Sequence, residues 1–199
     1  VWVFGWNKVS KTFHMISIWI VAIATNLSAL WILLANGWMQ HPVGYVIRNG
    51  RAEMVDFLAM VTNPYGLLKF FHTVVSGYVV AAFFVLGISA WHLLRKNRPD
   101  FFLPSFRTGA VFGLASLFLV LLTGDFHAVE VAKTQPAKFA AMESVWETRR
   151  GAGMCLLAVP DPDNERNCVE VLTIPKMLSY LAFHRPDGEV RGLKDFRED

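Results

Sequence analysis

His72 carries the most distinctive chemical possibility in this sequence. It lies near the start of an apolar run that is long enough to cross a membrane. Polar groups inside such a run are costly, so they are considered first as functional candidates. An imidazole there can be an axial haem ligand through one ring nitrogen while the other donates a hydrogen bond. Lys69, three residues earlier, shares its helical face and can meet a haem propionate.

A structural interpretation of His72 also stands. Under it, the histidine lies at the membrane interface and forms a hydrogen bond to a neighbouring helix. Gly77 and Ala81, four residues apart, allow either a flat macrocycle or another helix to approach closely. The residues alone leave both interpretations open.

Lys138 and Glu143 form a second candidate site. They lie in a short amphipathic helix that is predicted for residues 138–147. One face of this helix is expected to carry Phe139, Met142 and Trp146. Five residues on an ideal helix correspond to a divergence of about 140°, which is poor spacing for an ion pair. The two charges can instead hold opposite ends of a ligand, or they can belong to a solvated surface helix.

The first apolar run also contains polar residues. Ser28 lies near its middle with Thr25 and Asn26, and Asn36 lies near its outer end. Such groups either form hydrogen bonds between helices or order water along a proton path. Hydrogen bonding between helices is the commoner outcome.

The composition and the hydropathy pattern indicate an all-α integral membrane fold. Hydrophobic residues make up 54% of the 199 residues and charged residues 18%, which leaves too little polar surface to cover a soluble globule. Three apolar runs predict complete transmembrane helices at 13–35, 70–94 and 106–124. We expect residues 101–104 to lie in the interface before the third helix begins. Gly109 and Gly113 within that helix are interpreted as a packing face.

The distribution of Lys and Arg predicts the orientation of these helices. Short basic clusters precede the first helix and join the second to the third, so both segments are expected on the cytoplasmic side. The loops 39–69 and 125–199 are therefore expected outside. This gives a transmembrane region at 1–124 and an outward-facing region at 125–199. The clusters account for the net charge of +3 without nucleic-acid binding.

The two ends and the outward-facing region carry further expectations. Residues 1–6 are apolar and aromatic and are interpreted as the last turns of an earlier span, which makes the chain an internal fragment. Residues 153–175 alternate enough to suggest a hairpin. A turn centred on 160–163 would bring Cys155 and Cys168 opposite each other; a turn nearer Asn164 would not. The two cysteines are left unpaired by default.

Several stretches together resemble the larger, haem-bearing subunit of the cytochrome bd-type quinol oxidases, a respiratory family of bacteria and archaea. The matching stretches run in order along the chain, at 26–40, 69–78, 87–91 and 133–148. The long run NLSALWILLANGWMQ is highly specific. The resemblance implies a multi-pass protein of the cytoplasmic membrane that oxidises ubiquinol or menaquinol outside and reduces dioxygen to water. Turnover in that family charges the membrane without proton pumping, and a smaller subunit II completes the enzyme.

The resemblance also assigns roles to individual residues. His72 matches the axial ligand of the low-spin haem b, and Lys138 and Glu143 match a lysine and a glutamate of the quinol-binding loop. Ser28 and Asn36 match polar positions near the proton or oxygen routes. The intact subunit would also hold a high-spin haem b and haem d, whose ligands are absent from this chain, as is the methionine expected opposite His72. The fragment alone is therefore expected to be inactive.

Two other functions are compatible with parts of the sequence. A diheme b-type membrane anchor would handle quinone without reducing oxygen, but it would need a second histidine facing His72 from another span. A transporter or receptor bundle would bind no haem.

Overall fold

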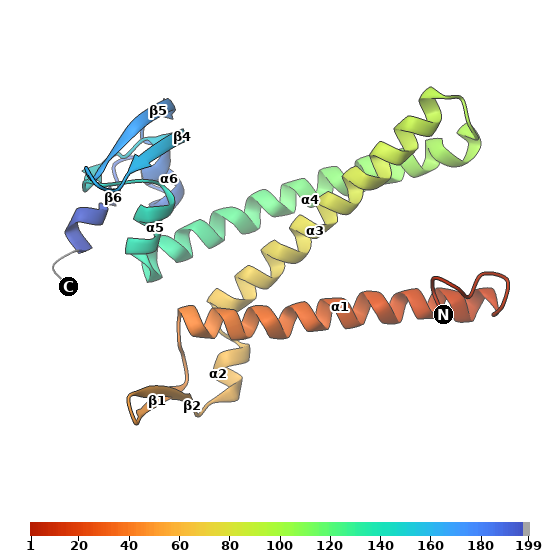
Figure 1. Cartoon of the computed structure of the whole chain (residues 1–199), viewed down its shortest axis with the longest axis horizontal. Coiled ribbons are helices and arrows are strands. Elements are labelled where there is room, and N and C mark those ends of the chain that lie inside the picture. The colour runs from red at the N-terminus through yellow and green to blue at the C-terminus, as the bar shows by residue number, and fades with distance from the viewer. Residues whose placement is uncertain (197–199) are drawn as a thin grey trace. The chain divides into compact units, whose positions relative to one another are not determined.

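The computed structural model describes residues 1–196 and divides into two compact units, Val1–Val120 and the residues from Leu121 onward (Figure 1). The α-helices are α1 (Lys11–Gln40), α2 (Phe57–Val61), α3 (Pro64–Leu94), α4 (Pro99–Thr134), α5 (Pro136–Met142) and α6 (Met177–Phe183). A 3-10 helix, η1 (Leu193–Phe196), follows them. The strands are β1 (Tyr45–Arg48), β2 (Arg51–Met54), β3 (Arg149–Arg150), β4 (Met154–Asp161), β5 (Arg166–Ile174) and β6 (Glu189–Val190).

Three of the helices, α1, α3 and α4, are long and apolar enough to cross a membrane. This confirms the expectation of three long apolar helices. Local chemistry marks their starts: the Ser10 side chain accepts a hydrogen bond from the Phe13 N–H, and the Asn63 side chain accepts one from the Tyr65 N–H. Pro64 occupies the first turn of α3, where its missing N–H costs nothing.

The predicted bounds of the third helix were wrong at both ends. Helix α4 begins at Pro99, so residues 101–104 are helical and do not precede the helix. Pro104 is tolerated because it follows the first turn closely and removes only one backbone hydrogen bond. At the other end α4 continues from 124 to Thr134, and Pro136 follows. Hydropathy marks where an apolar stretch ends, whereas the helix continues through polar residues until a proline approaches.

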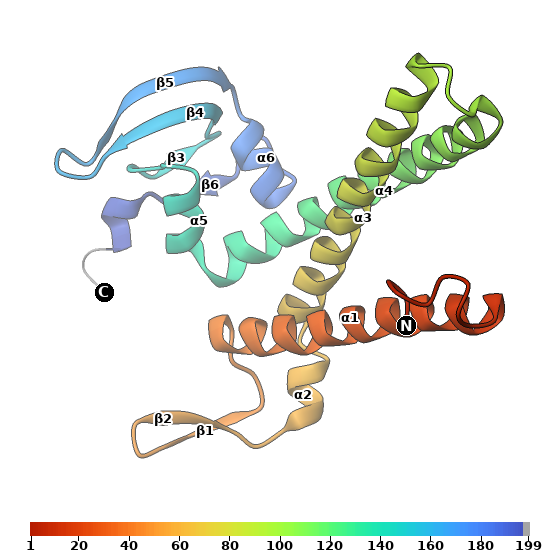
Figure 2. The same ribbon diagram turned by 45° about the vertical axis from the view of Figure 1, so that its right-hand side comes forward.

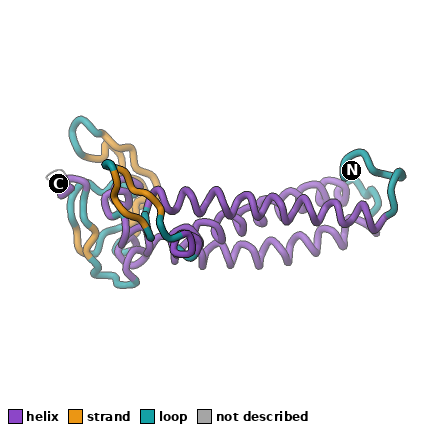
Figure 3. Tube along the Cα trace, turned by 90° about the horizontal axis from the view of Figure 1, so that it is seen from below, coloured by secondary structure: helices purple, strands orange, loops and turns teal. Residues whose placement is uncertain are grey.

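Two further expectations need correction. Residues 1–10 form turns and no helix, although the last helical turns of an earlier span were expected there. The fold is also not purely α-helical, because the described residues include three two-stranded antiparallel sheets (Figure 3). The β1–β2 hairpin was missed entirely. Its signal was the dipeptide Asn49-Gly50, whose positive φ angles of 50° and 71° suit a tight hairpin turn.

In the first unit, α1 and α3 cross (Figure 1), and Gly37 of α1 meets Gly66 of α3 at the crossing. A Cβ atom added to Gly37 would lie 2.6 Å from the Cα of Gly66. Leu34 and Tyr65, beside this crossing, are both completely buried. The absence of two side chains therefore allows the two backbones to touch.

The α3–α4 pair uses a similar device. A Cβ on Gly113 would lie 3.0 Å from the Ala82 Cβ, and one on Gly109 would lie 3.3 Å from Val85 Cγ1. This confirms the interpretation of Gly109 and Gly113 as a packing face. By contrast, apart from its chain neighbours and the nearby backbone of α3, no atom of residues 1–196 lies within 4 Å of a Cβ placed on Gly77.

The second unit contains the predicted hairpin, formed by β4 and β5 (Figure 2). Asp161 pairs with Arg166, so the connecting turn is 162–165 and lies nearer Asn164 than 160–163. Cys155 consequently pairs with Thr173 and does not face Cys168. Both cysteines are free, in agreement with the default expectation that they are unpaired.

The small core of the second unit joins α5, α6 and β6. Phe139, Leu178 and Val190 are among its buried apolar residues. The hydroxyl of Ser179, which is fully buried, accepts from the Ala152 N–H at 2.7 Å and donates to the Gly188 carbonyl at 2.7 Å. This hydroxyl fixes α6 against the segments on either side of it.

Candidate functional site

A polar cluster lies beside the crossing of α1 and α3. Lys69 Nζ donates to Asn36 Oδ1 at 2.9 Å, and Gln40 Nε2 donates to the same oxygen at 3.1 Å. Tyr65 Oη donates to Gln40 Oε1 at 2.9 Å, and the Lys69 ammonium lies 4.7 Å from the centre of the Tyr65 ring. The glycine crossing brings Asn36 within reach of Lys69, because it removes the side chains that would hold the helices apart.

The structure thus joins two residues to which the sequence assigned separate roles. Asn36 was expected near a proton or oxygen route, and Lys69 near a haem propionate. Their direct hydrogen bond shows that both also hold α1 to α3. An ammonium group has three donors, so this bond does not decide the expected propionate contact.

We predict that Asn36→Leu lowers the stability of the full-length protein by about 1.5–3 kcal/mol, because a hydrogen bond to a charged group is lost. Asn36→Asp keeps the acceptor oxygen and should cost less. Thermal unfolding of the purified protein in detergent measures the difference. Ser28→Ala is the matched control, because Ser28 is exposed on the same helix. Equal stability of the Leu and Ala variants would contradict the structural role of Asn36.

His72 lies one turn beyond Lys69 on α3. It is half-buried, as are Lys69, Ser76 and Val79, which recur at helical spacing along one face. Ser76 Oγ donates back to the His72 carbonyl at 2.7 Å. The hydroxyl is therefore directed to the backbone and does not compete for the imidazole.

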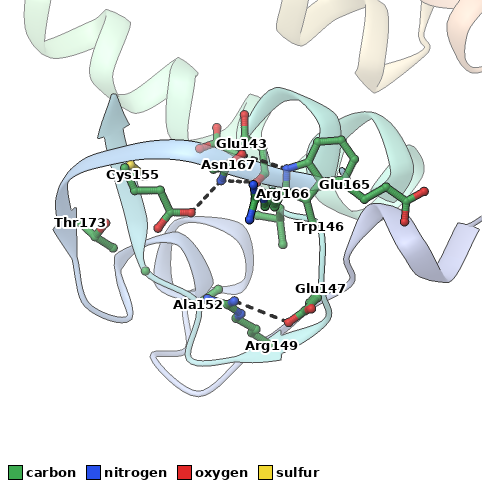
Figure 4. Close-up of a pocket in the computed structure, with 14 residues that line it drawn as sticks. Glu143, Trp146, Glu147, Arg149, Ala152, Cys155, Glu165, Arg166, Asn167 and Thr173 are labelled. Atoms are coloured by element: carbon green, nitrogen blue, oxygen red, sulfur yellow. Dashed lines mark hydrogen bonds and ion pairs between the residues drawn. The ribbon is translucent and has the colours of Figure 1, made fainter. Parts of the chain in front are cut away.

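The other predicted region lies in the second unit, where Glu143 lines a cavity of about 380 Å³. The cavity is bounded by the segment after α5 and by the β4–β5 hairpin (Figure 4). Its charged wall residues are Glu143, Glu147, Arg149, Glu165, Arg166 and Glu170. Partial burial raises the pKa of the Glu143 carboxyl above its ordinary value of 4.5. Glu143 is therefore a stronger base than a solvated glutamate.

The helix that carries Lys138 and Glu143 is shorter than predicted. α5 ends at Met142, with Glu143 as its C-cap, and Ser144 has a positive φ of 52°. Trp146 therefore does not share a helical face with Phe139, as was expected. Lys138 is exposed on α5 and is not part of the cavity wall. Glu143 therefore lines the cavity and Lys138 does not.

Asn167 on β5 was not singled out from the sequence, yet it contacts the segment after Glu143. Its Nδ2 donates to the Ser144 carbonyl at 3.0 Å, and its Oδ1 accepts from Trp146 Nε1 at 2.9 Å (Figure 4). No sequence signal pointed to this residue, because the contact depends on how the hairpin folds back on the chain.

Comparison with known proteins covers the whole chain. Residues 1–199 match the family described as cytochrome bd terminal oxidase subunit I. The chain belongs to this family. The membership confirms the resemblance seen in the sequence, and it sets aside a haem-free transporter bundle and a diheme anchor.

Individual members of the cytochrome bd oxidase family are also similar to this chain. It is 47% identical to the cytochrome bd-II ubiquinol oxidase subunit 1 of Escherichia coli over 96% of its length, and 40% identical to the Bacillus subtilis cytochrome bd ubiquinol oxidase subunit 1 over 100%. These matches cover 38% and 42% of the two relatives. The bd oxidase structure from Geobacillus thermodenitrificans aligns with a TM-score of 0.82 at 29% identity, covering 99% of this chain and 45% of that one. The chain therefore spans about two fifths of its relatives' length.

Members of the cytochrome bd oxidase family bind haem, and the surroundings of His72 fit that group. A neutral imidazole nitrogen is a common axial ligand of haem iron. The half-buried position of His72 on α3 limits its access to water. The Ser76 hydroxyl does not hydrogen-bond to the ring in place of the metal. The surroundings of His72 are therefore compatible with the haem-ligand role that the resemblance assigns to it.

Proposed function

We propose that this chain supplies the quinol-oxidising region and one haem ligand of a terminal oxidase. The observation that carries the proposal is the placement of Glu143 in the wall of a cavity, where burial raises its pKa. A carboxylate with a raised pKa suits general-base catalysis near neutral pH. Family membership supplies the substrate class.

The chemistry asked of Glu143 is proton acceptance. Oxidation of a quinol to a quinone releases two electrons and two protons from its hydroxyl groups. A Glu143 carboxylate oxygen accepts a proton from a quinol hydroxyl as electrons leave, and it then passes the proton to the outer solvent. Lys138, exposed on α5 five residues before Glu143, contributes a cation to quinol binding.

The names of the relatives leave the quinol species open. Two matched proteins are named ubiquinol oxidase subunits, and a third, 28% identical, is named a putative menaquinol oxidase subunit of Bacillus subtilis. The proposal therefore names a membrane quinol as a class. In the intact enzyme, dioxygen is the electron acceptor and the smaller subunit II is the partner.

His72 is proposed to hold the haem that accepts the electrons. A low-spin haem b bound there would supply one-electron redox chemistry. The chain's own contribution is the imidazole, its half-buried position on α3, and the Lys69–Asn36 bond that holds α1 to α3. Haem d and the second haem b would belong to parts of the subunit outside this chain. Ser28 and Asn36 are proposed to line a proton or oxygen route.

Glu143→Gln in the full-length oxidase tests the proposal. We expect kcat/KM for quinol to fall about a hundredfold, within the range of general-base contributions. The parent enzyme should lose quinol activity as pH falls through the raised pKa of Glu143, because the carboxylate that accepts the proton is then protonated. The variant should lack this acidic limb. Steady-state oxygen uptake between pH 4.5 and 8 measures both effects.

Asp163→Asn provides the matched control, because Asp163 is exposed on the turn of the β4–β5 hairpin and does not line the cavity. Its quinol kinetics should stay within about twofold of the parent, since a surface carboxylate with no catalytic role contributes little. Tetramethylphenylenediamine, which donates electrons without a proton, should be oxidised equally by all three proteins. An unchanged acidic limb in Glu143→Gln would contradict the assigned role.

A further inference from the structure

The segment that carries Glu143 has little regular structure of its own. Helix α5 ends one residue earlier, and Ser144 turns the chain with a left-handed φ. A side chain at such a turn can explore several directions unless the backbone is held elsewhere. A base must lie within hydrogen-bonding reach of the proton that it accepts, so this freedom would reduce its efficiency. The contacts that hold residues 144–146 therefore bear on the chemistry.

Two parts of the second unit hold this segment. On one side, the Leu193 N–H donates to the Val145 carbonyl at 2.9 Å, and the Lys194 N–H donates to the Trp146 carbonyl at 3.1 Å. These are backbone contacts that many side chains would permit. On the other side, the contact depends on a single side chain, that of Asn167 on β5.

The Asn167 amide uses both of its ends. Its nitrogen donates to the Ser144 carbonyl at 3.0 Å and to Glu170 Oε1 at 2.7 Å. Its oxygen accepts from Trp146 Nε1 at 2.9 Å. Figure 4 shows Asn167 between Glu143 and Trp146, on the wall that both share. An aspartate would turn an acceptor toward two oxygen atoms, and an apolar residue would leave the Ser144 carbonyl and the indole N–H without this partner.

We propose that Asn167 is a positioning residue for quinol oxidation, which holds the turn after α5 so that Glu143 stays in the cavity wall. This inference rests on the proposed function of Glu143. It adds that the β4–β5 hairpin supports the site, although no hairpin residue is needed for the proton transfer itself. The hairpin acts through Ser144 and Trp146, the residues that follow the base.

The test uses Asn167→Ala in the full-length oxidase. Hydrogen–deuterium exchange of residues 143–148 should become about tenfold faster, because the segment loses its side-chain anchor. In the same protein the quinol kcat/KM should fall about tenfold, because small displacements of a catalytic group cost one to two orders of magnitude. Oxidation of tetramethylphenylenediamine and the haem content should not change, because neither requires Glu143.

Two further variants keep the test specific. Trp146→Phe keeps an aromatic side chain but lacks the indole N–H that donates to Asn167, so it should show the same changes at smaller size, about threefold. Asn164→Ala removes an asparagine from the turn of the same hairpin. The Asn164 side chain donates a hydrogen bond to Asp161 there. This control should leave exchange at 143–148 and quinol kinetics unchanged. If Asn167→Ala does not assemble, Trp146→Phe carries the test.

The outcomes separate the inference from the function on which it rests. Unchanged exchange at 143–148 in Asn167→Ala overturns the positioning role. Faster exchange in Asn167→Ala with parental quinol kinetics also overturns it, provided that Glu143→Gln is impaired. If Glu143→Gln also has parental quinol kinetics, the proposed function fails, and the inference fails with it. Faster exchange together with impaired quinol oxidation, absent in Asn164→Ala, supports the inference.

Discussion

His72→Ala in the full-length subunit is expected to abolish the absorbance of the low-spin haem b while the signals of the other haems remain. Alanine offers no nitrogen to the iron, and loss of an axial ligand removes the low-spin state. Quinol-driven oxygen uptake should fall to background, because the haem proposed to accept the electrons of quinol would be lost. Reduced-minus-oxidised difference spectra of membranes measure the first effect, and oxygen uptake measures the second.

His92→Ala is the matched control on the same helix. The His92 ring stacks on Phe102 with centroids 4.0 Å apart, and its Nδ1 lies 2.9 Å from Asn97 Nδ2. These contacts give it a local structural role at the turn between α3 and α4. The control should keep all haem signals. Retention of the low-spin signal in His72→Ala, with normal expression, would rule out His72 as the ligand.

Gly37→Val should prevent stable assembly of the oxidase. Even a single Cβ at this position would lie 2.6 Å from the Gly66 backbone, which cannot rotate away as a side chain can. Valine adds two methyl groups to that clash, so α1 and α3 must separate and the Lys69–Asn36 bond must break. Overpacking of this kind costs about 1–3 kcal/mol, to which the lost polar contacts add about 1.5–3 kcal/mol. The yield of folded complex after size-exclusion chromatography and its thermal midpoint measure the loss.

Gly87→Ala is the control for helical glycines. It lies on α3, and apart from its chain neighbours and the nearby backbone of α3, no atom of the described residues comes within 4 Å of the Cβ that it would gain. Alanine also favours a helix over glycine by about 1 kcal/mol. The control should therefore be as stable as the parent or slightly more stable. Normal assembly of Gly37→Val would show that the helices do not cross at this point.

Both predictions concern the surroundings of one face of α3. The glycine crossing positions α1, the Lys69–Asn36 bond fastens it, and His72 follows one turn later. A change far from the haem ligand can therefore disturb the ligand's surroundings through helix packing. The quinol region has its own support in the second unit, where Asn167 holds the turn after Glu143.

The long helices, one packing face and the family could be predicted from residue types and spacing. An uncharged run of some twenty residues can satisfy its backbone in lipid only as a helix, so the three long helices follow from hydropathy alone. The Gly109 and Gly113 motif likewise predicted packing, because only small residues allow two helices to approach. The specific run at 26–40, with three further stretches, carried the resemblance to the family that the match of residues 1–199 confirms.

Helix ends and turns were less accessible to this reasoning. Hydropathy placed the end of the third helix at 124, ten residues short, because polar residues can continue a helix as well as apolar ones. The helix predicted for residues 138–147 was too long, because the amphipathic spacing of the sequence continues beyond the left-handed turn at Ser144. The β1–β2 hairpin was not predicted, although the dipeptide Asn49-Gly50 is a clear hairpin signal.

The sequence by itself determined the membrane helices, the family, and the residues His72, Lys138 and Glu143 as chemical candidates, because these depend on composition and local order. Only the tertiary structure decided that Asn36 meets Lys69, that Cys155 and Cys168 stay apart, and that Asn167 holds the turn beside Glu143. Each of these depends on residues between 13 and 33 positions apart. Such contacts are set by how backbones cross and pair, and no local pattern encodes that register. His72 therefore remains the residue that the sequence singled out first, and the structure adds the polar bond and the helix crossing beside it.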